Sequence, residues 1–356
     1  VKKFHEIDGI NGRKIIRPTE DVGALAAGTS TGMECKGDNG DVVDWWAAVK
    51  YPDGSSYSYA DASSPAFQKS SFDMSNANSG ALSATLNQIY AGSESSTGYI
   101  FYNDESPDGK TWGTAWGHFK GVVGMTSSGG FWLVHSTPRI PETVAVGWSG
   151  FPQKAMKYGQ TFLCLTLSTD SLNTVGVQMQ IARPHIFDSR APSFVANSMP
   201  ELQNAINGDH VKTASTSIKD ITSKGGESFT SFMKTGKWGK DLYEDLVAPT
   251  LKAGLYTETW QNGVGNLPSY CNSSYPFNAI NIDHVRTAEG LVWKNSQDHS
   301  KWCVTMDRNA KVACFGGINR QHGNTVRGGG TLCWKDNKVV WESVLSMVED
   351  LKPCDN

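Results

Sequence analysis

Apolar segments separated by turn residues give the first half of the chain the pattern of β-strands. Residues 42–51 are rich in aromatic and β-branched side chains, and Pro52-Asp53-Gly54-Ser55 then turns the chain into residues 57–59, which predicts a β-hairpin. A second strand pair is predicted on either side of Ser127-Ser128-Gly129-Gly130. The strands of that pair are residues 118–125 and 131–134. Two further strands are predicted in this half, residues 98–102 and 161–167.

Apolar residues recur at helical spacing in three segments. Residues 81–90 and 200–206 predict helices, and residues 242–251 predict an amphipathic helix that Pro249 should kink or end. The core strands predicted in the second half are residues 291–294, 302–306 and 312–318. This mixture of strands and helices in both halves predicts an α/β fold of the mixed α+β kind.

The charge of the chain favours binding to a polyanion only in acid. The 356 residues carry a formal net charge of −3 at pH 7, which argues against a permanently basic nucleic-acid-binding protein. Eight histidines can add eight charges and move that balance to +5, and histidine titrates near pH ~6.5. No apolar run approaches the roughly 18–20 residues of a membrane span, so no membrane partner is expected.

Seven cysteines indicate an oxidising compartment. They include no C-x-x-C pair and no Cys/His spacing typical of zinc. Their scatter along the chain is typical of a disulfide framework, so we expect a secreted, periplasmic or lysosomal protein. The sequence alone does not fix which cysteines pair.

One motif occurs twice, about half a chain apart. The pattern H-x-K-x-x-V-x-M begins at His118 and again at His299, 181 positions later. Residues i and i+2 of a strand point to the same face, so Lys120 should project beside the first histidine and Lys301 beside the second. An imidazole beside a fixed cation suits an anionic substrate, above all a phosphate. Two such pairs predict a duplicated fold that brings both to one active site.

The surroundings of the motif resemble the phospholipase D superfamily. The second pair is followed by an apolar strand and then by Gly316-Gly317-Ile318-Asn319, which fits the G-G-x-N pattern of that superfamily. The superfamily's Asp five residues after the Lys is absent, because Met125 and Met306 occupy those positions. In the first half, His135 stands near the place where the Asn is expected.

Longer blocks resemble one branch of the superfamily, the acid endonuclease deoxyribonuclease II. They run in order from about Cys35 to Cys354, so the resemblance covers nearly the whole chain, and they include residues 102–104, 117–122, 132–136, 159–164 and 298–302. The resemblance implies an endonuclease that needs no metal or other cofactor. Such an enzyme cuts double-stranded DNA through a phosphohistidine and leaves 3′-phosphate and 5′-hydroxyl ends.

The resemblance also implies an architecture and a disulfide pattern. We expect a phospholipase D-like pseudo-dimer, in which residues 1–175 and residues 176–356 each form a mixed β-sheet flanked by helices. No linker composition marks the boundary, so the halves should pack tightly. The implied disulfides join Cys35 to Cys164, Cys271 to Cys354 and Cys314 to Cys333, which leaves Cys303 as a buried free thiol rather than a catalytic one.

Two histidines and two lysines can together cleave a phosphodiester. One imidazole attacks phosphorus while the other, protonated, donates to the departing oxygen. Lys120 and Lys301 neutralise the phosphoryl oxygens. By analogy with the superfamily, His118 is the nucleophile and His299 the general acid. Since two nearby imidazoles compete for charge, one neutral and one protonated ring is the favoured state, and this selects mildly acidic operation.

Other candidate site residues lie outside the two pairs. The amide of Asn319 can donate a hydrogen bond to the phosphate, and the family resemblance places His135 in the site. The run from Lys234 to Lys240 interleaves cations with an aromatic residue, so Lys237 and Lys240 are candidate contacts to a phosphate backbone.

Three rival functions fit parts of the pattern. A metal centre would gather His118, His135, Asp298 and His299, but the two lysines in the same pocket would repel a dication. A phosphodiesterase acting on lipid or another diester would keep both pairs, although the superfamily's Asp is missing. A nucleic-acid-binding protein without turnover needs cations but has no use for two imidazoles. The sequence leaves the quaternary state open, with a homodimer among the alternatives.

Overall fold

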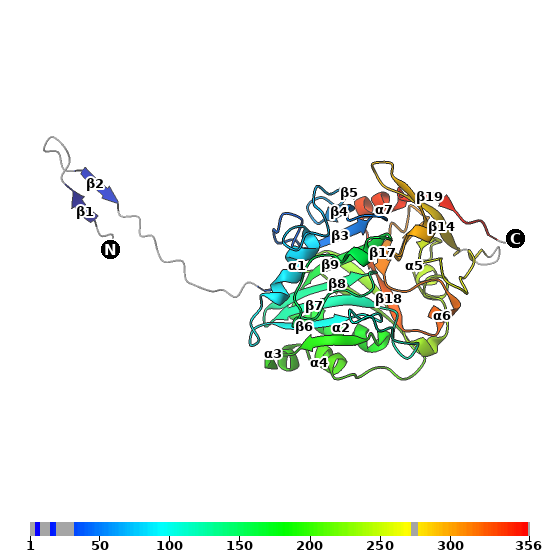
Figure 1. Cartoon of the computed structure of the whole chain (residues 1–356), viewed down its shortest axis with the longest axis horizontal. Helices are drawn as coiled ribbons and strands as arrows, with labels where there is room; N and C mark the ends of the chain where they lie inside the picture. The colour runs from blue at the N-terminus through cyan, green and yellow to red at the C-terminus, as the bar shows by residue number, and fades with distance from the viewer. Residues whose placement is uncertain (1–3, 8–14, 19–31, 272–276, 355–356) are drawn as a thin grey trace. The chain divides into compact units, whose positions relative to one another are not determined.

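The computed structural model describes residues 4–7, 15–18, 32–271 and 277–354 (Figure 1). The chain divides into two units, Val1–Thr31 and Gly32–Asn356. In the first unit, β1 (Phe4–Ile7) pairs antiparallel with β2 (Ile15–Pro18). Every residue predicted for the active site lies in the second unit.

The first half of this second unit forms an eight-stranded antiparallel sheet in the order β10-β6-β7-β8-β9-β3-β4-β5. The predicted hairpin and the predicted second strand pair are confirmed as β3–β4 and β7–β8. The bounds are β3 (Trp45–Lys50), β4 (Tyr57–Asp61), β5 (Gln68–Lys69), β6 (Gly98–Tyr102), β7 (Lys120–Thr126), β8 (Gly129–His135), β9 (Gln160–Leu167) and β10 (Ile186–Arg190).

The second half forms another sheet, in the order β11-β12-β18-β17-β16-β13-β14-β15, and β19 also pairs with β14. Its pairs are antiparallel except for the parallel pair β13–β14, so the sheet is mixed. The bounds are β11 (Thr216–Thr222), β12 (Ser228–Lys234), β13 (Leu255–Glu258), β14 (Ala279–Arg286), β15 (Val292–Lys294), β16 (Trp302–Thr305), β17 (Ala313–Gly316), β18 (Gly329–Trp334) and β19 (Val348–Leu351).

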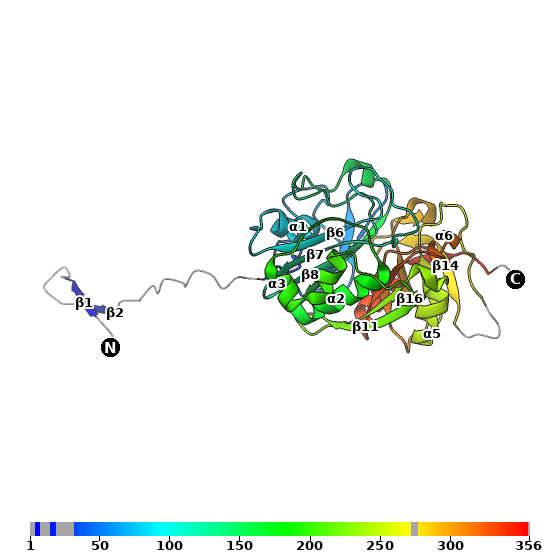
Figure 2. The same cartoon turned by 90° about the horizontal axis from the view of Figure 1, so that it is seen from below.

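Helices cover both faces of the first sheet (Figure 2). The predicted helix α1 (Ala81–Tyr90) packs on one face, where its Leu86 shares a core with Trp46 of β3. On the other face, Leu172 of α2 shares a second core with Trp45. The bounds of the other helices are α2 (Thr169–Ala182), α3 (Ser193–Ser198), α4 (Pro200–Ile206), α5 (Ala248–Leu251), α6 (His322–Thr325) and α7 (Lys338–Leu345). The predicted mixed α+β fold is confirmed.

The two sheets share that second core. Trp45 of β3 and Trp334 of β18 meet edge to face, with ring centroids 5.5 Å apart, and Phe67 lies 5.9 Å from Phe315 of β17. Buried aromatic pairs of this kind contribute about 0.5–1.5 kcal/mol beyond the area they bury. The sheets are therefore packed on one another through bulky side chains, as the absence of a linker led us to expect.

Two segments differ from the helices or boundaries expected. Within residues 242–251, Tyr243–Val247 form a π-helical turn that continues into α5, which ends two residues after Pro249. The expected boundary near residue 175 lies inside α2, and the first sheet continues beyond it to β10. Within the described residues, we find no helix with the length and apolarity needed to cross a membrane.

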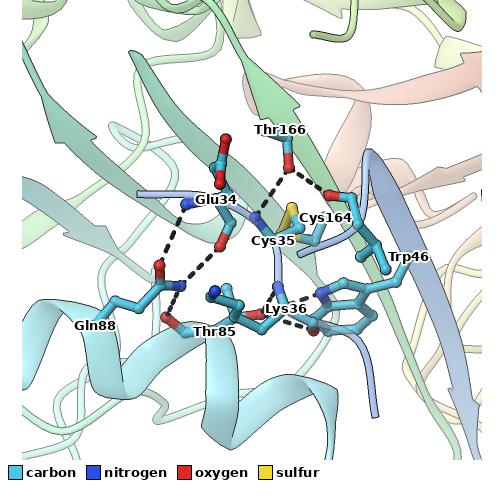
Figure 3. The surroundings of a disulfide bond; sticks show 9 residues. Glu34, Cys35, Lys36, Trp46, Thr85, Gln88, Cys164 and Thr166 are labelled. Atoms are coloured by element: carbon cyan, nitrogen blue, oxygen red, sulfur yellow. Dashed lines mark hydrogen bonds between the residues drawn. A yellow bond between two sulfur atoms is a disulfide. The ribbon is translucent and has the colours of Figure 1, made fainter. Parts of the chain in front are cut away.

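Three disulfides join the cysteines that the family resemblance implied: Cys35 with Cys164, Cys271 with Cys354 and Cys314 with Cys333. The first ties the segment before β3 to β9 (Figure 3). Around it, the amide of Cys35 donates to the hydroxyl of Thr166, and the indole of Trp46 donates to Thr85 of α1. Cys303 is a free, buried thiol in β16, as expected.

Candidate active site

Backbone groups at the ends of two strands of the second sheet hold His118, which lies two residues before β7. Its amide donates to the carbonyl oxygen of Gly328 at 2.9 Å, and its Nδ1 atom lies 2.5 Å from the carbonyl oxygen of Gly317. A carbonyl only accepts hydrogen bonds, so Nδ1 must carry a proton. This fixes the ring orientation and leaves Nε2 for chemistry.

His299 is held in the same way by the backbone of the first sheet. Its amide donates to the carbonyl oxygen of Gly159 at 2.9 Å, and its Nδ1 lies 3.0 Å from the carbonyl oxygen of Ser136. The 181 positions between the two histidines also separate Ser136 from Gly317. Each half of the chain therefore orients the catalytic candidate of the other half with an equivalent carbonyl.

Lys120 belongs to a buried ion cluster that the sequence did not predict. Its Nζ pairs with Oδ1 of Asp104, whose Oδ2 lies 2.9 Å from Arg327 Nη2 and 3.9 Å from Nε2 of His118. Burial alone would raise the pKa of Asp104, but the charges of Lys120, His118 and Arg327 outweigh burial and hold it well below its usual range. The carboxylate is therefore ionised beside the first imidazole.

Lys301 has no such partner. Its Nζ donates to the carbonyl oxygen of His299 and lies 2.9 Å from Nδ1 of the same ring. In the described part of the chain, no carboxylate forms an ion pair with it; neighbouring Asp298 instead accepts from the indole of Trp293 and the amide of Ser300. Burial and the charge of Lys120 hold the pKa of Lys301 well below its ordinary value.

The charged groups of the four motif residues act on one another electrostatically. Burial and the charge of Lys120 keep the pKa of His118 well below its ordinary value. Burial and then the charges of Lys301, Lys120 and His118 do the same for His299. Both imidazoles are therefore neutral at pH 7.

His135 lies beside the four motif residues, on the strand next to Lys120. It is the cross-strand neighbour of Lys120 and stacks on Phe162 of β9, with ring centroids 5.9 Å apart. The ring is buried, and neither nitrogen has a hydrogen-bond partner among the described residues. Burial and the charge of Lys120 lower the pKa of His135 to about 3.

The three predicted substrate-binding residues lie in different surroundings. Asn319 is buried two residues after the carbonyl that holds His118, and its Oδ1 has no partner in the described structure. Lys237 lines a hollow near His118. Lys240 lies outside that hollow, with its Nζ 6.0 Å from the ring centroid of Trp238.

Two hollows border the site. One, of about 630 Å³, is bounded by Gly117 and Gly328, next to His118. The other, of about 800 Å³, contains His299 and Trp260, whose ring centroids lie 5.0 Å apart. The larger hollow therefore opens onto His299, and the smaller one lies beside the backbone that holds His118.

The alternative metal centre has no matching geometry. No group of three or more His, Cys, Asp or Glu side chains in the described residues is arranged to hold an ion. The charged neighbours of the two imidazoles are instead the ammonium groups of Lys120 and Lys301 and the ion cluster of Asp104.

Comparison with known proteins shows the family of this chain. Residues 34–354 match the protein family described as Deoxyribonuclease II. Plancitoxin-1 of Acanthaster planci is 34% identical over 345 residues, which cover 93% of this chain and 95% of that protein. Deoxyribonuclease-2-alpha of Mus musculus is 34% identical, with 90% of this chain and 94% of that protein covered. Cell death-related nuclease 6 of Caenorhabditis elegans is 32% identical, with 92% and 90% covered.

Proposed function

Because the chain belongs to the deoxyribonuclease II family, and is thus a hydrolase that acts on DNA, we propose that it cuts double-stranded DNA in acid without a metal. The proposed reaction passes through a phosphohistidine and leaves 3′-phosphate and 5′-hydroxyl ends. The three disulfides fit an oxidising compartment, and we propose that the protein is secreted or lysosomal.

The main support for this proposal is the way in which the two histidines are held. Nδ1 of each motif histidine lies within hydrogen-bond distance of a backbone carbonyl of the other half, so the rings of His118 and His299 are both held in a fixed orientation. Two imidazoles prepared in this way, each two residues before a buried lysine, meet the needs of in-line displacement at phosphorus. A protein that only binds nucleic acid would gain nothing from holding two imidazole rings in fixed orientations.

The charges around the two rings favour a division of roles opposite to the superfamily analogy. The carboxylate of Asp104 lies 3.9 Å from Nε2 of His118 and offsets part of the opposition that Lys120 and Arg327 present to a proton there. His299 has the ammonium of Lys301 beside it instead, which opposes protonation. We therefore assign His118 as the general acid and His299 as the nucleophile.

The proposed reaction has two steps, formation of the phosphohistidine and its hydrolysis. Nε2 of neutral His299 attacks phosphorus, the bond from phosphorus to the 5′-oxygen breaks, and that oxygen takes the Nε2 proton of His118. In the second step, water attacks the phosphohistidine and gives a proton to Nε2 of His118. The phosphorus–nitrogen bond breaks, His299 leaves as a neutral imidazole, and the 3′-phosphate is released.

The lysines and His135 complete the proposed site. The ammonium groups of Lys120 and Lys301 neutralise the phosphoryl oxygens as charge moves onto them. The N–H of the His135 ring and the Nδ2 group of Asn319, which otherwise reaches Oε1 of Gln321 at 3.5 Å, donate hydrogen bonds to the same oxygens. Burial keeps the pKa of His118 below that of a free imidazole, so the general acid is charged only when the pH falls, and the reaction is expected to be fastest in acid.

A plasmid-nicking assay tests the proposal. Supercoiled DNA should be nicked at pH 5 with or without EDTA, and much more slowly at pH 7.5. Activity that disappears with EDTA and returns with a divalent cation would contradict the metal-independent mechanism. DNA binding without nicking at either pH would favour a protein that only binds. Cleavage of a lipid diester but not of DNA would favour the other phosphodiesterase.

A further inference from the structure

The hollow beside His118 is lined by basic and neutral residues. Arg183, Lys212, Lys237 and His210 line it, and no acidic side chain does. The hollow of about 800 Å³ near His299 differs, because Glu105, Asp108 and Glu142 there oppose Arg139 and Lys154. A polyanion that reaches the catalytic residues therefore meets excess positive charge on the His118 side only.

The basic hollow is joined to the catalytic machinery through its backbone. Gly117, which precedes His118, donates its amide to the carbonyl oxygen of Arg183 at 2.8 Å. Gly328 lines the hollow and accepts the amide of His118. A Cβ atom added to Gly117 or Gly328 would lie within 2.2 Å of the carbonyl oxygen of Ala182, so only glycine permits these close contacts. The hollow thus begins where the general acid is anchored.

The cations come from three separate segments and point to an elongated ligand. Arg183 ends α2 in a left-handed conformation, and its guanidinium carbon lies 5.0 Å from the ring centroid of Trp116. Lys212 lies in the segment before β11, and Lys237 lies in the turn after β12. Both lysine side chains are exposed, so they can meet successive phosphates without a desolvation cost.

We propose that this hollow holds the phosphodiester backbone of the DNA beside the scissile phosphate, through Arg183, Lys212 and Lys237. The inference rests on the proposed function for the identity of the substrate, but it concerns binding and is tested apart from turnover.

The test is DNA binding in an uncleaving background. His299→Ala is combined with Arg183→Gln, Lys212→Gln and Lys237→Gln, and the anisotropy of a labelled duplex is measured at pH 5 over a range of salt. The control removes equal charge at Lys69, Lys219 and Lys252. These exposed side chains line neither hollow.

Each lost phosphate contact lowers the slope of log Kd against log salt by about 0.9. The triple substitution should therefore reduce the slope by about 2–3 and raise Kd at least about tenfold at 0.15 M salt, while the control changes the slope by less than about 0.5. A slope equal to that of the His299→Ala parent, or an equal loss in the control, would overturn the proposal.

Two further measurements keep the outcome clear. If the triple variant has a lowered melting temperature, the pair Lys212→Gln and Lys237→Gln, both exposed, should still reduce the slope by about 1–2. One outcome is that the His299→Ala protein shows this salt dependence while the unsubstituted protein fails to nick plasmid. That result would refute the proposed nuclease mechanism but would support DNA binding in the hollow. If the unsubstituted protein nicks plasmid and the substitutions do not change DNA binding, the nuclease mechanism is supported and DNA binding in the hollow is refuted.

Discussion

The Nδ1 atom of His299 lies 3.0 Å from the carbonyl oxygen of Ser136, a residue 163 positions earlier in the chain. His118 makes the corresponding contact with Gly317. Neither half can therefore orient its own histidine. If the two histidines act as proposed, damage to the interface between the sheets should reduce turnover before it reduces DNA binding.

The division of roles between the histidines can be tested with a better leaving group. His118→Ala and His299→Ala should each lower kcat on DNA by at least about 10²–10⁴-fold, since each removes a group that acts in the transition state. A nitrophenyl phosphodiester needs little protonation as it departs. It should partly restore turnover in His118→Ala but not in His299→Ala.

Rescue of His299→Ala alone would restore the superfamily order, with His118 as nucleophile. Near-normal turnover of DNA by either variant would remove the two-histidine mechanism. Circular dichroism and melting temperature should confirm that both variants remain folded.

Asp104 should set the pH at which the general acid works. An opposite charge about 4–6 Å away typically moves a pKa by 1–3 units, so Asp104→Asn should shift the high-pH limb of the kcat profile, where the general acid loses its proton, to lower pH by at least about one unit. The direction follows because a neutral amide no longer stabilises the proton on His118. Asp104→Glu should restore part of the profile.

Asp220 offers a matched control, because its exposed carboxylate pairs with Lys335 at the surface. Asp220→Asn should leave the pH profile unchanged. An unshifted profile in Asp104→Asn, with kcat lowered equally at every pH, would mean that Asp104 only anchors Lys120 and Arg327.

His135 should make the fold less stable in acid. Its pKa is about 3 in the folded protein and about 6.5 in an unfolded chain, so the unfolded state alone takes up a proton between these values. The free energy of unfolding should therefore fall by roughly 1.4 kcal/mol per pH unit below 6.5 from this residue. His135→Leu removes that contribution, and urea unfolding at pH 7, 5.5 and 4.5 measures it.

The same variant tests whether His135 contributes to catalysis. If its nitrogens bind a phosphoryl oxygen, His135→Leu should lower kcat by about 10–100-fold, since a lost hydrogen bond to a charged group is worth roughly 1.5–3 kcal/mol. Full activity together with the altered pH dependence of stability would make His135 a structural residue only.

Cys303 should be dispensable for catalysis. Burial raises the pKa of its thiol far above neutrality, so it does not form the thiolate that a nucleophile requires. Cys303→Ala should keep most activity. Reduction of the disulfides should instead destabilise the fold, because native bridges typically contribute about 2–5 kcal/mol each. A folded but inactive Cys303→Ala protein would contradict this assignment.

Local sequence patterns predicted the elements whose side chains repeat with a clear period. The turn at Pro52-Asp53-Gly54-Ser55, the apolar spacing in α1 and the segment that forms β6 each point to one structure. Helix α2 was missed because its buried residues include Gly176 and Gln178 among apolar ones, so its apolar period is weak. The strands β14 and β18 were also not predicted, since their burial depends on neighbouring strands from distant parts of the chain.

The two His-x-Lys pairs and the family can be identified from the sequence, because they depend on side-chain identities at fixed spacing. The orientation of the two imidazoles depends on tertiary structure. The carbonyls of Ser136 and Gly317 leave no mark in a sequence, since every residue has a carbonyl and only packing aims one at an imidazole. Asp104 meets Arg327 for the same reason: the two sheets must pack before charges so far apart in the chain can form one buried cluster.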